Sequence, residues 1–335
     1  MTAGSLGSCT EPLDRTYDLA MLDLDGVVYI GPEAVPGAPE HVAAARTEGM
    51  RVAFITNNAS RPPSAVAEHL RGLGVEAGAD DVVTSAQAAA RVLIDRLGEG
   101  GRVVVLGGDG LADAIAEVGL EQVGVEEDGA AVVTGYGPDV LWGQIMRGAV
   151  RIKEGLWWVA SNTDQTFPTS FGVAPGHGVL VETLRRFSGV DPVVAGKPSR
   201  PLLDETRRRC GGERPLMVGD RLDTDIEGAH TAGVDSLLVM TGVTGLAELV
   251  AAPPELRPTY VSADLGGLHA AHPAPEVSDD GVTLGGWTAH VDDGELVVDG
   301  AGEVDDWWRV VAAAAWRHLD THGEPVAVGA VAAPE

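Results

Sequence analysis

Short apolar runs alternate with longer amphipathic segments over most of this chain. The runs have the length of buried strands, and the segments between them carry alanine, valine and leucine at helical spacing. This alternation is typical of a parallel sheet with helices on its faces, so the predicted fold class is α/β. The predicted strands cover residues 18–24, 51–56, 82–83, 102–106, 131–134, 157–160, 193–195, 216–218 and 236–240. The predicted helices cover residues 40–48, 63–73, 86–97, 111–118, 139–152, 201–210 and 226–232.

The middle of the chain has its own alternation, which predicts a smaller α/β unit inserted into a larger one. A length of 335 residues exceeds what one hydrophobic core usually serves, so we expect two compact domains and an appendage. We predict a discontinuous core at 14–85 and 194–268, built on a parallel sheet, with an inserted domain at 86–193. Motifs on both sides of the insertion would then complete one site.

A proline- and alanine-rich linker at 269–275 leads to a C-terminal appendage at 276–335, for which we predict a small α+β structure. Trp307, Trp308 and Trp316 fall at helical spacing, which favours a packing stripe over a ligand cage. The appendage carries no catalytic motif that we can identify. Its predicted elements are the two strands of a hairpin, a helix and a final strand, at residues 283–290, 295–299, 304–322 and 326–328.

Charge and cysteine content exclude several classes of partner. The formal net charge of -27 would repel the phosphates of nucleic acid and of anionic lipid, so we expect neither a nucleic-acid nor a membrane partner. The same charge would repel an anionic small substrate unless a local cation or basic group reversed the field. Cys9 and Cys210 are the only cysteines, and no stretch has the character of an export signal or a membrane span. We therefore expect a cytoplasmic protein.

Two aspartates stand at the end of the first apolar run. Asp23 and Asp25 are two residues apart, and Gly26 behind them allows a sharp turn. Strand geometry would place both side chains on one side of the strand. The pair suits a nucleophile beside a general acid/base, because one carboxylate can attack phosphorus while the other moves a proton. An ordinary acidic loop is the alternative interpretation.

Polar residues also follow two later runs. Thr56 ends the 51–56 run and Asn57 follows it, at the place where open α/β sheets bind ligands. The two residues could cradle a phosphoryl group or form a simple turn. Lys197 is one of two lysines in a chain that takes most of its positive charge from arginine. Its compact ammonium could neutralise a carboxylate and a phosphoryl oxygen together, although a solvent-exposed lysine at a helix entry is the alternative.

A second acidic loop follows the 216–218 run. Its three acids, Asp220, Asp223 and Asp225, suit a Mg²⁺ site, because this ion favours one or two carboxylates, a carbonyl and several waters, with substrate phosphate completing the shell. Asp223 or Asp225 could instead cap the following helix, and for Asp223 we favour the cap.

As a set, these segments resemble the motifs of haloacid dehalogenase (HAD) superfamily phosphatases of the NagD-like subgroup, which includes phosphoglycolate, pyridoxal-phosphate and glycerol-3-phosphate phosphatases. The resemblance spans residues 18–249 with the motifs in family order, and it implies a Rossmann-like core with a large α/β cap inserted between the second and third motifs. The matching segments are Asp23-Leu-Asp-Gly, Thr56-Asn-Asn, Gly196-Lys-Pro-Ser and Gly219-Asp-Arg-Leu-Asp-Thr-Asp-Ile.

The resemblance implies catalytic and phosphate-binding roles. Asp23 would be the nucleophile that forms an aspartyl-phosphate. Asp25 would protonate the leaving alcohol and then activate water. Thr56, Asn57 and Lys197 would hold the phosphoryl group.

The resemblance also implies Mg²⁺ as the cofactor. Its ligands would be the Asp23 carboxylate, the main-chain carbonyl of Asp25 and the Asp220 carboxylate, while Asp225 would orient the coordination shell.

In the cap, Asn162 and Asp164 lie in a segment that resembles the family's return from cap to core. They could shape or close the site, or serve structure alone. His177 and Arg61 are assigned no role. A cap of this size excludes bulky protein substrates, and the resemblance allows a homodimer through the cap.

The sequence thus predicts a Mg²⁺-dependent phosphomonoester hydrolase acting on a small phosphorylated metabolite. Glycerol 3-phosphate is the first choice, because the appendage resembles that of glycerol-phosphate phosphatases. 2-Phosphoglycolate, pyridoxal phosphate and sugar or nucleotide monophosphates are alternatives. A phospho-accepting signalling protein would use a similar acidic pocket but would need neither the cap nor Asp25. A regulatory protein that retains a phosphatase core is a third class.

Overall fold

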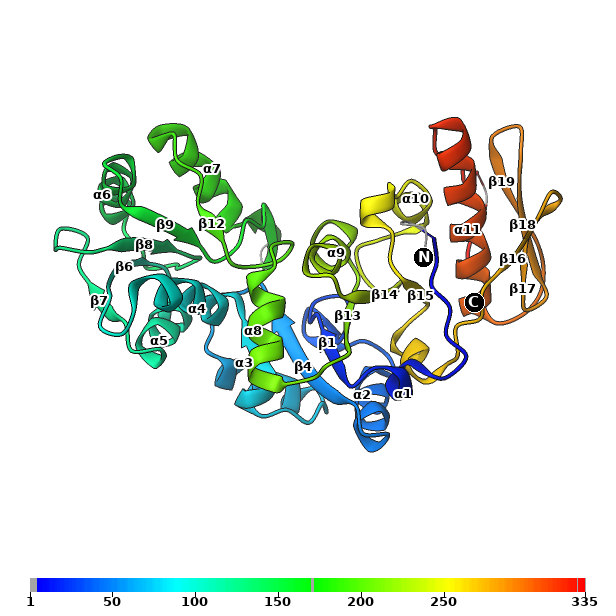
Figure 1. Ribbon diagram of the computed structural model, residues 1–335, viewed down its shortest axis with the longest axis horizontal. Coiled ribbons are helices and arrows are strands. Elements are labelled where there is room, and N and C mark those ends of the chain that lie inside the picture. The colour runs from blue at the N-terminus through cyan, green and yellow to red at the C-terminus, as the bar shows by residue number, and fades with distance from the viewer. Residues whose placement is uncertain (1–4, 170–171, 330, 335) are drawn as a thin grey trace. The chain divides into compact units, whose positions relative to one another are not determined.

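The computed structural model describes residues 5–169, 172–329 and 331–334 (Figure 1). Packing divides the chain into two units. The first unit comprises Met1–Val52, Leu73–Val75 and Gly212–Glu335, and the second comprises Ala53–Gly72 and Glu76–Gly211. The boundaries of these units differ from those predicted for the core, cap and appendage. The predicted division into these three domains therefore stays a prediction.

Four parallel strands form a sheet in the first unit, in the order β15-β14-β13-β1. Every residue of β1 and β13 is buried, as expected for strands covered on both faces. The strands are β1 (Leu19–Leu22), β13 (Pro215–Gly219), β14 (Asp235–Val239) and β15 (Tyr260–Ser262). Other elements of this part are α1 (Leu13–Thr16), β2 (Tyr29–Ile30), β3 (Glu33–Ala34), α2 (Ala38–Thr47), the π-helical turn Leu222–Ile226, α9 (Glu227–Ala232), α10 (Leu246–Val250) and the 3₁₀ turns Pro254–Leu256 and Leu265–His269.

Five parallel strands form a sheet in the second unit, in the order β12-β9-β8-β6-β7. Helices α4 and α5 lie on one side of this sheet, and α6 and α7 lie on the other (Figure 1). Trp158 of the sheet packs in one hydrophobic cluster with Ile152 of α6 and Leu184 of α7. The strands are β6 (Arg102–Leu106), β7 (Glu121–Val123), β8 (Ala131–Thr134), β9 (Trp157–Ala160) and β12 (Val193–Val194). The helices are α3 (Pro63–Gly72), α4 (Ser85–Leu97), α5 (Asp109–Glu117), α6 (Trp142–Lys153), α7 (His177–Ser188) and α8 (Pro201–Cys210).

Two smaller strand pairs complete the second unit. β4 (Arg51–Thr56) runs from the first unit into the second and pairs there in parallel with β5 (Val82–Thr84), which the 3₁₀ turn Ala79–Asp81 precedes. β10 (Thr166–Thr169) and β11 (Gly172–Pro175) form an antiparallel hairpin.

The C-terminal appendage is a four-stranded antiparallel sheet packed on one long helix, and it belongs to the first unit. Trp307, Trp308 and Trp316 are buried in a cluster that also contains Leu249 of α10 and Val261 of β15. The prediction of a packing stripe is therefore confirmed. The elements are β16 (Glu276–Ser278), β17 (Gly281–Leu284), β18 (Trp287–Asp292), β19 (Glu295–Gly300) and α11 (Val304–His322).

Polar contacts join α11 to the rest of the first unit. The Trp316 indole N–H donates to the Leu249 carbonyl at 2.8 Å. The buried Arg257 guanidinium forms two hydrogen bonds to the Asp320 carboxylate, at 2.6 and 2.8 Å. The appendage therefore shares a core with the parallel sheet.

The α/β fold class is confirmed, and several strands begin and end where the sequence predicts. One predicted strand, 283–290, is wrong. It divides into β17 and β18, because Gly285 and Gly286 have φ values of +57° and +92° and turn the chain inside the apolar run. The predicted helix at 226–232 is preceded by the π-helical turn Leu222–Ile226.

Candidate active site

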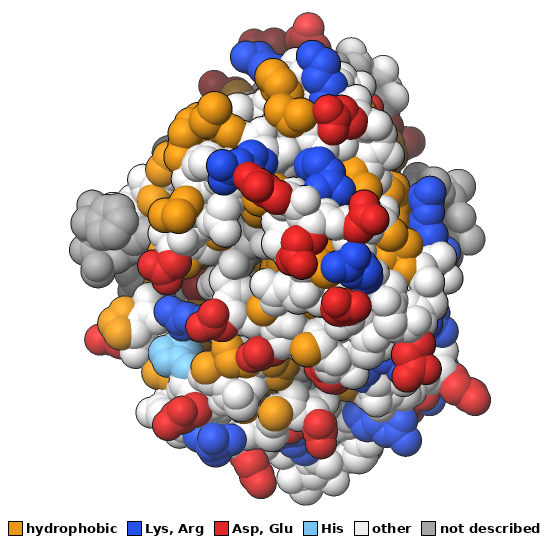
Figure 2. Space-filling view, turned by 90° about the vertical axis from the view of Figure 1, so that its left-hand side faces the viewer, with side chains coloured by type: hydrophobic (Ala, Val, Ile, Leu, Met, Phe, Trp, Pro, Cys, Tyr) orange, Lys and Arg blue, Asp and Glu red, His pale blue; other side chains and the backbone are white. Residues whose placement is uncertain are grey.

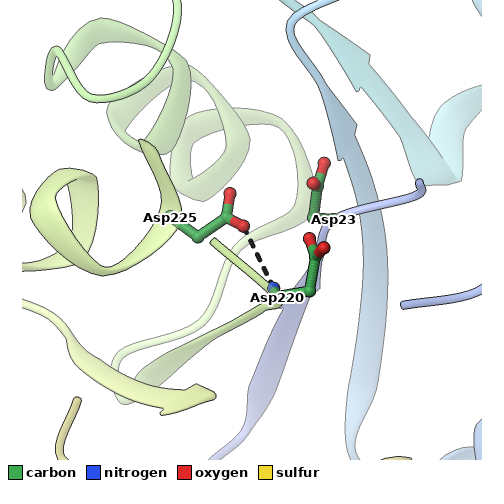
Figure 3. A group of neighbouring side chains, drawn as sticks. All are labelled: Asp23, Asp220 and Asp225. Atoms are coloured by element: carbon green, nitrogen blue, oxygen red, sulfur yellow. Dashed lines mark hydrogen bonds between the residues drawn. The ribbon is translucent and has the colours of Figure 1, made fainter. Parts of the chain in front are cut away.

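Three carboxylates gather beyond the ends of two neighbouring strands in the first unit. Asp23 follows β1, Asp220 follows β13, and Asp225 lies in the π-helical turn. Strands β1 and β13 pair in parallel with Leu22 opposite Val218, so the loops after them leave the same edge of the sheet. One oxygen from each of the three carboxylates lies within 4.8 Å of the others. The carboxylates of Asp23 and Asp220 lie side by side in Figure 3.

Backbone N–H groups hold two of these carboxylates in place. The Asp225 carboxylate accepts a hydrogen bond from the backbone nitrogen of Asp220 at 3.2 Å (Figure 3). It also accepts one from the backbone nitrogen of Arg221 at 3.1 Å. The Asp220 carboxylate accepts from the backbone nitrogen of Val243 at 2.7 Å, and the Asp220 carbonyl accepts from Thr244 at 3.1 Å. Both side chains are fully buried. Their positions are fixed by the main chain of two loops.

Close approach of the main chain to these carboxylates requires glycine. A Cβ atom at Gly26 or Gly242 would collide with the Asp220 carboxylate, and one at Gly219 would collide with that of Asp225. Gly26 also has a φ of +85°, which side-chain-bearing residues rarely adopt. These glycines allow a carboxylate cluster with little room for other atoms.

The cluster fits a hard divalent cation. Like charges this close repel each other strongly in a buried setting, and a cation offsets that repulsion. Oxygen-only ligands in this number suit Mg²⁺ or Ca²⁺ rather than a softer metal. Among the residues that the structure describes, this is the one group of three or more potential ligands close enough to hold a metal ion.

Asp25 has a different setting from Asp23. Its side chain is exposed, whereas that of Asp23 is half-buried. The turn behind it is closed by a hydrogen bond from the Gly26 nitrogen to the Tyr29 carbonyl, and Thr241 donates to the Gly26 carbonyl at 2.6 Å. A carboxyl group that reaches solvent on an ordered turn is suited to exchanging protons.

The predicted phosphate-binding residues lie in the second unit. Thr56 and Lys197 are 6% and 2% exposed. The Asn57 side chain donates to the Lys197 carbonyl at 3.0 Å and accepts from the Lys197 nitrogen at 2.8 Å. It also donates to the Asp164 carboxylate at 3.0 Å. Both N–H groups of this amide are thus used within the protein, which leaves the Asn57 backbone N–H for the predicted phosphate contact.

The structure brings Asn162 and Asp164 together with Asn57. The Asn162 side chain donates to the Asn57 carbonyl at 2.8 Å, and the Ser85 hydroxyl donates to the same carbonyl at 2.5 Å. The Thr56 hydroxyl accepts from the Asn58 nitrogen at 3.1 Å and can still donate its own hydrogen.

Some features of the site were not foreseen. The Thr241–Thr244 loop that holds Asp220 follows the predicted 236–240 strand, and its glycine, Gly242, was a signal for a close main-chain approach. The expectation that Asp223 caps a helix is wrong. Its exposed carboxylate instead pairs with the Arg221 guanidinium, at 2.9 and 3.0 Å.

Comparisons with known proteins agree with this arrangement. A family model for haloacid dehalogenase-like hydrolases matches residues 20–121, and a second model for HAD-like hydrolases matches residues 194–268. The D-glycerol 3-phosphate phosphatase of Mycobacterium tuberculosis is 41% identical over 334 residues, which cover 94% of this chain and 91% of that protein. The chain belongs to the haloacid dehalogenase-like hydrolase family.

Solved structures of HAD phosphatases show the same fold. The glycerol phosphate phosphatase of M. tuberculosis in complex with magnesium has a TM-score of 0.84 at 40% identity, with 92% of each chain covered. The 4-nitrophenylphosphatase of Thermotoga maritima has a TM-score of 0.71 at 30% identity, covering 77% of this chain and 97% of that one. In the described part of this HAD chain, no helix is both long and apolar enough to cross a membrane.

Proposed function

We propose that this chain is a Mg²⁺-dependent phosphatase that hydrolyses glycerol 3-phosphate through an aspartyl-phosphate. The observation that carries this proposal is the carboxylate group of Asp23, Asp220 and Asp225 beyond β1 and β13, in a HAD-family chain. The cation would be held by the Asp23 and Asp220 carboxylates and the main-chain carbonyl of Asp25. When bound, Mg²⁺ offsets negative charge on the carboxylates and on the phosphoryl oxygens.

Asp23 and Asp25 divide the chemistry between them. An Asp23 oxygen attacks phosphorus, the bond from phosphorus to the substrate oxygen breaks, and an acyl phosphate forms on Asp23. Asp25 gives its proton to the departing alcohol. Asp25 then removes a proton from a water molecule whose oxygen attacks the phosphorus of the intermediate, which releases inorganic phosphate and restores the Asp23 carboxylate. The exposure of Asp25 supports the proton-transfer role.

Thr56, Asn57 and Lys197 hold the phosphoryl group in this proposal. Thr56 offers a hydroxyl hydrogen, Asn57 a backbone N–H, and Lys197 an ammonium group. A positive charge here counters the repulsion between an anionic ester and a chain of net charge -27. The Asp225 carboxylate acts on the site through the backbone of Asp220, to which it is hydrogen-bonded.

Glycerol 3-phosphate is favoured over other esters because the match to a glycerol 3-phosphate phosphatase covers more of the chain than the match to a nucleotidase. The match to the glycerol 3-phosphate phosphatase covers 94% of the chain, which includes much of the appendage. The match to the 5'-nucleotidase YutF of Bacillus subtilis, at 35% identity, covers 69%. We expect kcat/KM to be highest for glycerol 3-phosphate in a panel that also contains 2-phosphoglycolate, pyridoxal phosphate, a sugar phosphate and a nucleoside monophosphate.

The deciding experiment measures phosphate release from this panel by wild type and by Asp23→Asn, with Mg²⁺ and with EDTA. Release that requires the metal and is lost in Asp23→Asn supports the proposal, because the carboxamide keeps the shape but is a poor nucleophile. Asp25→Asn should slow both steps and still form some acyl phosphate. Release from Asp23→Asn at the wild-type rate would refute the mechanism, and a better ester would replace glycerol 3-phosphate.

We also propose a homodimer through the cap, in the cytoplasm. Trp142, Met146 and Val150 recur every four residues along α6 and are 65%, 56% and 44% exposed. Such a row of exposed apolar side chains favours a protein contact. Figure 2 shows the side of the second unit on which α6 lies, with hydrophobic side chains among charged ones. Met146→Glu should convert a dimer to a monomer in sedimentation, whereas the control Val277→Glu should not. A monomeric wild type would contradict the proposal.

A further inference from the structure

One buried histidine in the second unit has no part in the mechanism above. His177 is the first residue of α7 and is 4% exposed. Its Nδ1 lies 2.9 Å from the carbonyl oxygen of Asn162. A carbonyl can only accept, so Nδ1 carries the hydrogen and the neutral ring leaves Nε2 without one. Nε2 is buried and has no hydrogen-bond partner among the described residues.

The first residues of α7 are hydrogen-bonded to residues 164–165, which precede the helix in the chain. The Gly178 nitrogen donates to the Asp164 carbonyl at 2.8 Å, and the Gly176 nitrogen donates to the Gln165 carbonyl at 2.7 Å. A Cβ atom at Gly176 would collide with Asp164, and one at Gly178 would collide with the Thr163 carbonyl. Between these two glycines, His177 supplies the side chain that reaches back to Asn162.

The 162–164 segment is in turn hydrogen-bonded to Asn57. Asn162 donates to the Asn57 carbonyl, and Asp164 accepts from the Asn57 side chain. The same Asn57 side chain pairs with both the N–H and the carbonyl of Lys197. A continuous series of hydrogen bonds therefore runs from the His177 ring to the main chain of Lys197.

We propose that His177 is a positioning residue for phosphate binding: its Nδ1–H fixes the 162–164 segment, which holds Asn57 and, through it, the main chain of Lys197. This inference rests on the proposed function, in which Thr56, Asn57 and Lys197 bind the phosphoryl group. His177 touches neither the phosphate nor the reacting atoms. Burial lowers the pKa of His177 to about 4, which keeps the ring in the required neutral form near pH 7.

Two substitutions separate positioning from packing. His177→Asn keeps an N–H donor one bond from Cγ, as in the imidazole, whereas His177→Leu fills space without a donor. With Leu, we expect KM for the ester and the inhibition constant of inorganic phosphate to rise about tenfold, the effect of one lost buried hydrogen bond, with a smaller change in kcat. With Asn, both constants should stay near the wild-type values.

A second readout is independent of activity. Hydrogen exchange at the Lys197 amide, followed by mass spectrometry, should be faster in His177→Leu than in wild type and restored in His177→Asn. Unchanged exchange and unchanged constants in His177→Leu would overturn the proposal, as would equal changes in both variants. If His177→Leu fails to fold, His177→Ala takes its place. If exchange changes in His177→Leu but the wild type hydrolyses no ester, the phosphatase function is refuted. The role of His177 in positioning Asn57 and Lys197 would still stand.

Discussion

Asp225 and Asp223 stand two residues apart in one loop, yet we expect their removal to have very different effects. The Asp225 carboxylate is fully buried and accepts hydrogen bonds from two backbone N–H groups. In Asp225→Ala both N–H groups lose this partner, at about 1–3 kcal/mol each, so the loop should lose about 2–6 kcal/mol of stability. Loss of a carboxylate also relieves repulsion from Asp23 and Asp220, which works in the opposite direction.

Asp225→Asn is the control that separates these effects. The amide lacks the charge, as alanine does, but its oxygen can still accept from both N–H groups. The difference in unfolding free energy between the two variants therefore isolates the hydrogen bonds. Asp223→Ala should cost no more than about 1 kcal/mol, because it removes an exposed ion pair with Arg221.

Urea unfolding in EDTA measures all three variants without interference from bound metal. A difference below about 1 kcal/mol between Asp225→Ala and Asp225→Asn would refute this reasoning, since the buried N–H of Asp220 and the part-buried N–H of Arg221 would both lose their acceptor. An Asp223→Ala variant as unstable as Asp225→Ala would refute it as well. A Mg²⁺ titration of the Asn variant then tests the effect on the ion, which we expect to bind more weakly.

Three further predictions concern the metal, the appendage and pH. Mg²⁺ at about 100 times its Kd should raise the unfolding free energy of wild type by about 2.7 kcal/mol, but not that of Asp220→Asn, as calorimetry with and without EDTA would reveal. Trp316→Phe should cost about 0.5–1.5 kcal/mol, because the Leu249 carbonyl loses the indole N–H and keeps the backbone N–H of Ala252. Trp316→Ala should cost about 3–5 kcal/mol, and a urea midpoint unchanged in both variants would contradict the shared core. The pKa of His177 is lowered to about 4 in the folded protein, whereas the unfolded chain would have the usual value near 6.5. Between these pH values the unfolded state binds a proton that the folded state does not, so the unfolding free energy should fall as pH drops from 6.5 to 4, by up to about 3 kcal/mol. Urea unfolding at pH 7 and pH 5 should show a steeper loss in wild type than in His177→Leu.

The sequence predicts the parallel strands well because each is an apolar run between helical segments. Residues 51–56, 102–106, 131–134 and 157–160 are strands over the predicted ranges. The β10–β11 hairpin was missed, since Thr166–Thr169 contains a proline and gives little periodic signal. The strand predicted at 283–290 failed because the turn inside it depends on two glycines whose conformation the apolar pattern does not reveal.

The carboxylate site was predictable for a similar reason. Acidic residues just past two apolar runs meet wherever the strands are parallel neighbours, and Asp23 and Asp220 do so. The loop at Val243 and Thr244 was not predicted, because its contact with Asp220 depends on tertiary packing. The hydrogen bonds of the Asn57 side chain could not be predicted either, since its partners Asp164 and Lys197 are distant in sequence.

The pairing of β1 with β13 has a consequence for synthesis of the protein. Asp23 leaves the ribosome early, whereas Asp220 and the strand that sets its position emerge only after the whole second unit has been made. Most of that second unit is one continuous stretch of chain and can fold while translation continues. The carboxylate cluster must therefore be assembled late, because a polypeptide truncated before β13 would contain Asp23 and the second unit but neither Asp220 nor Asp225.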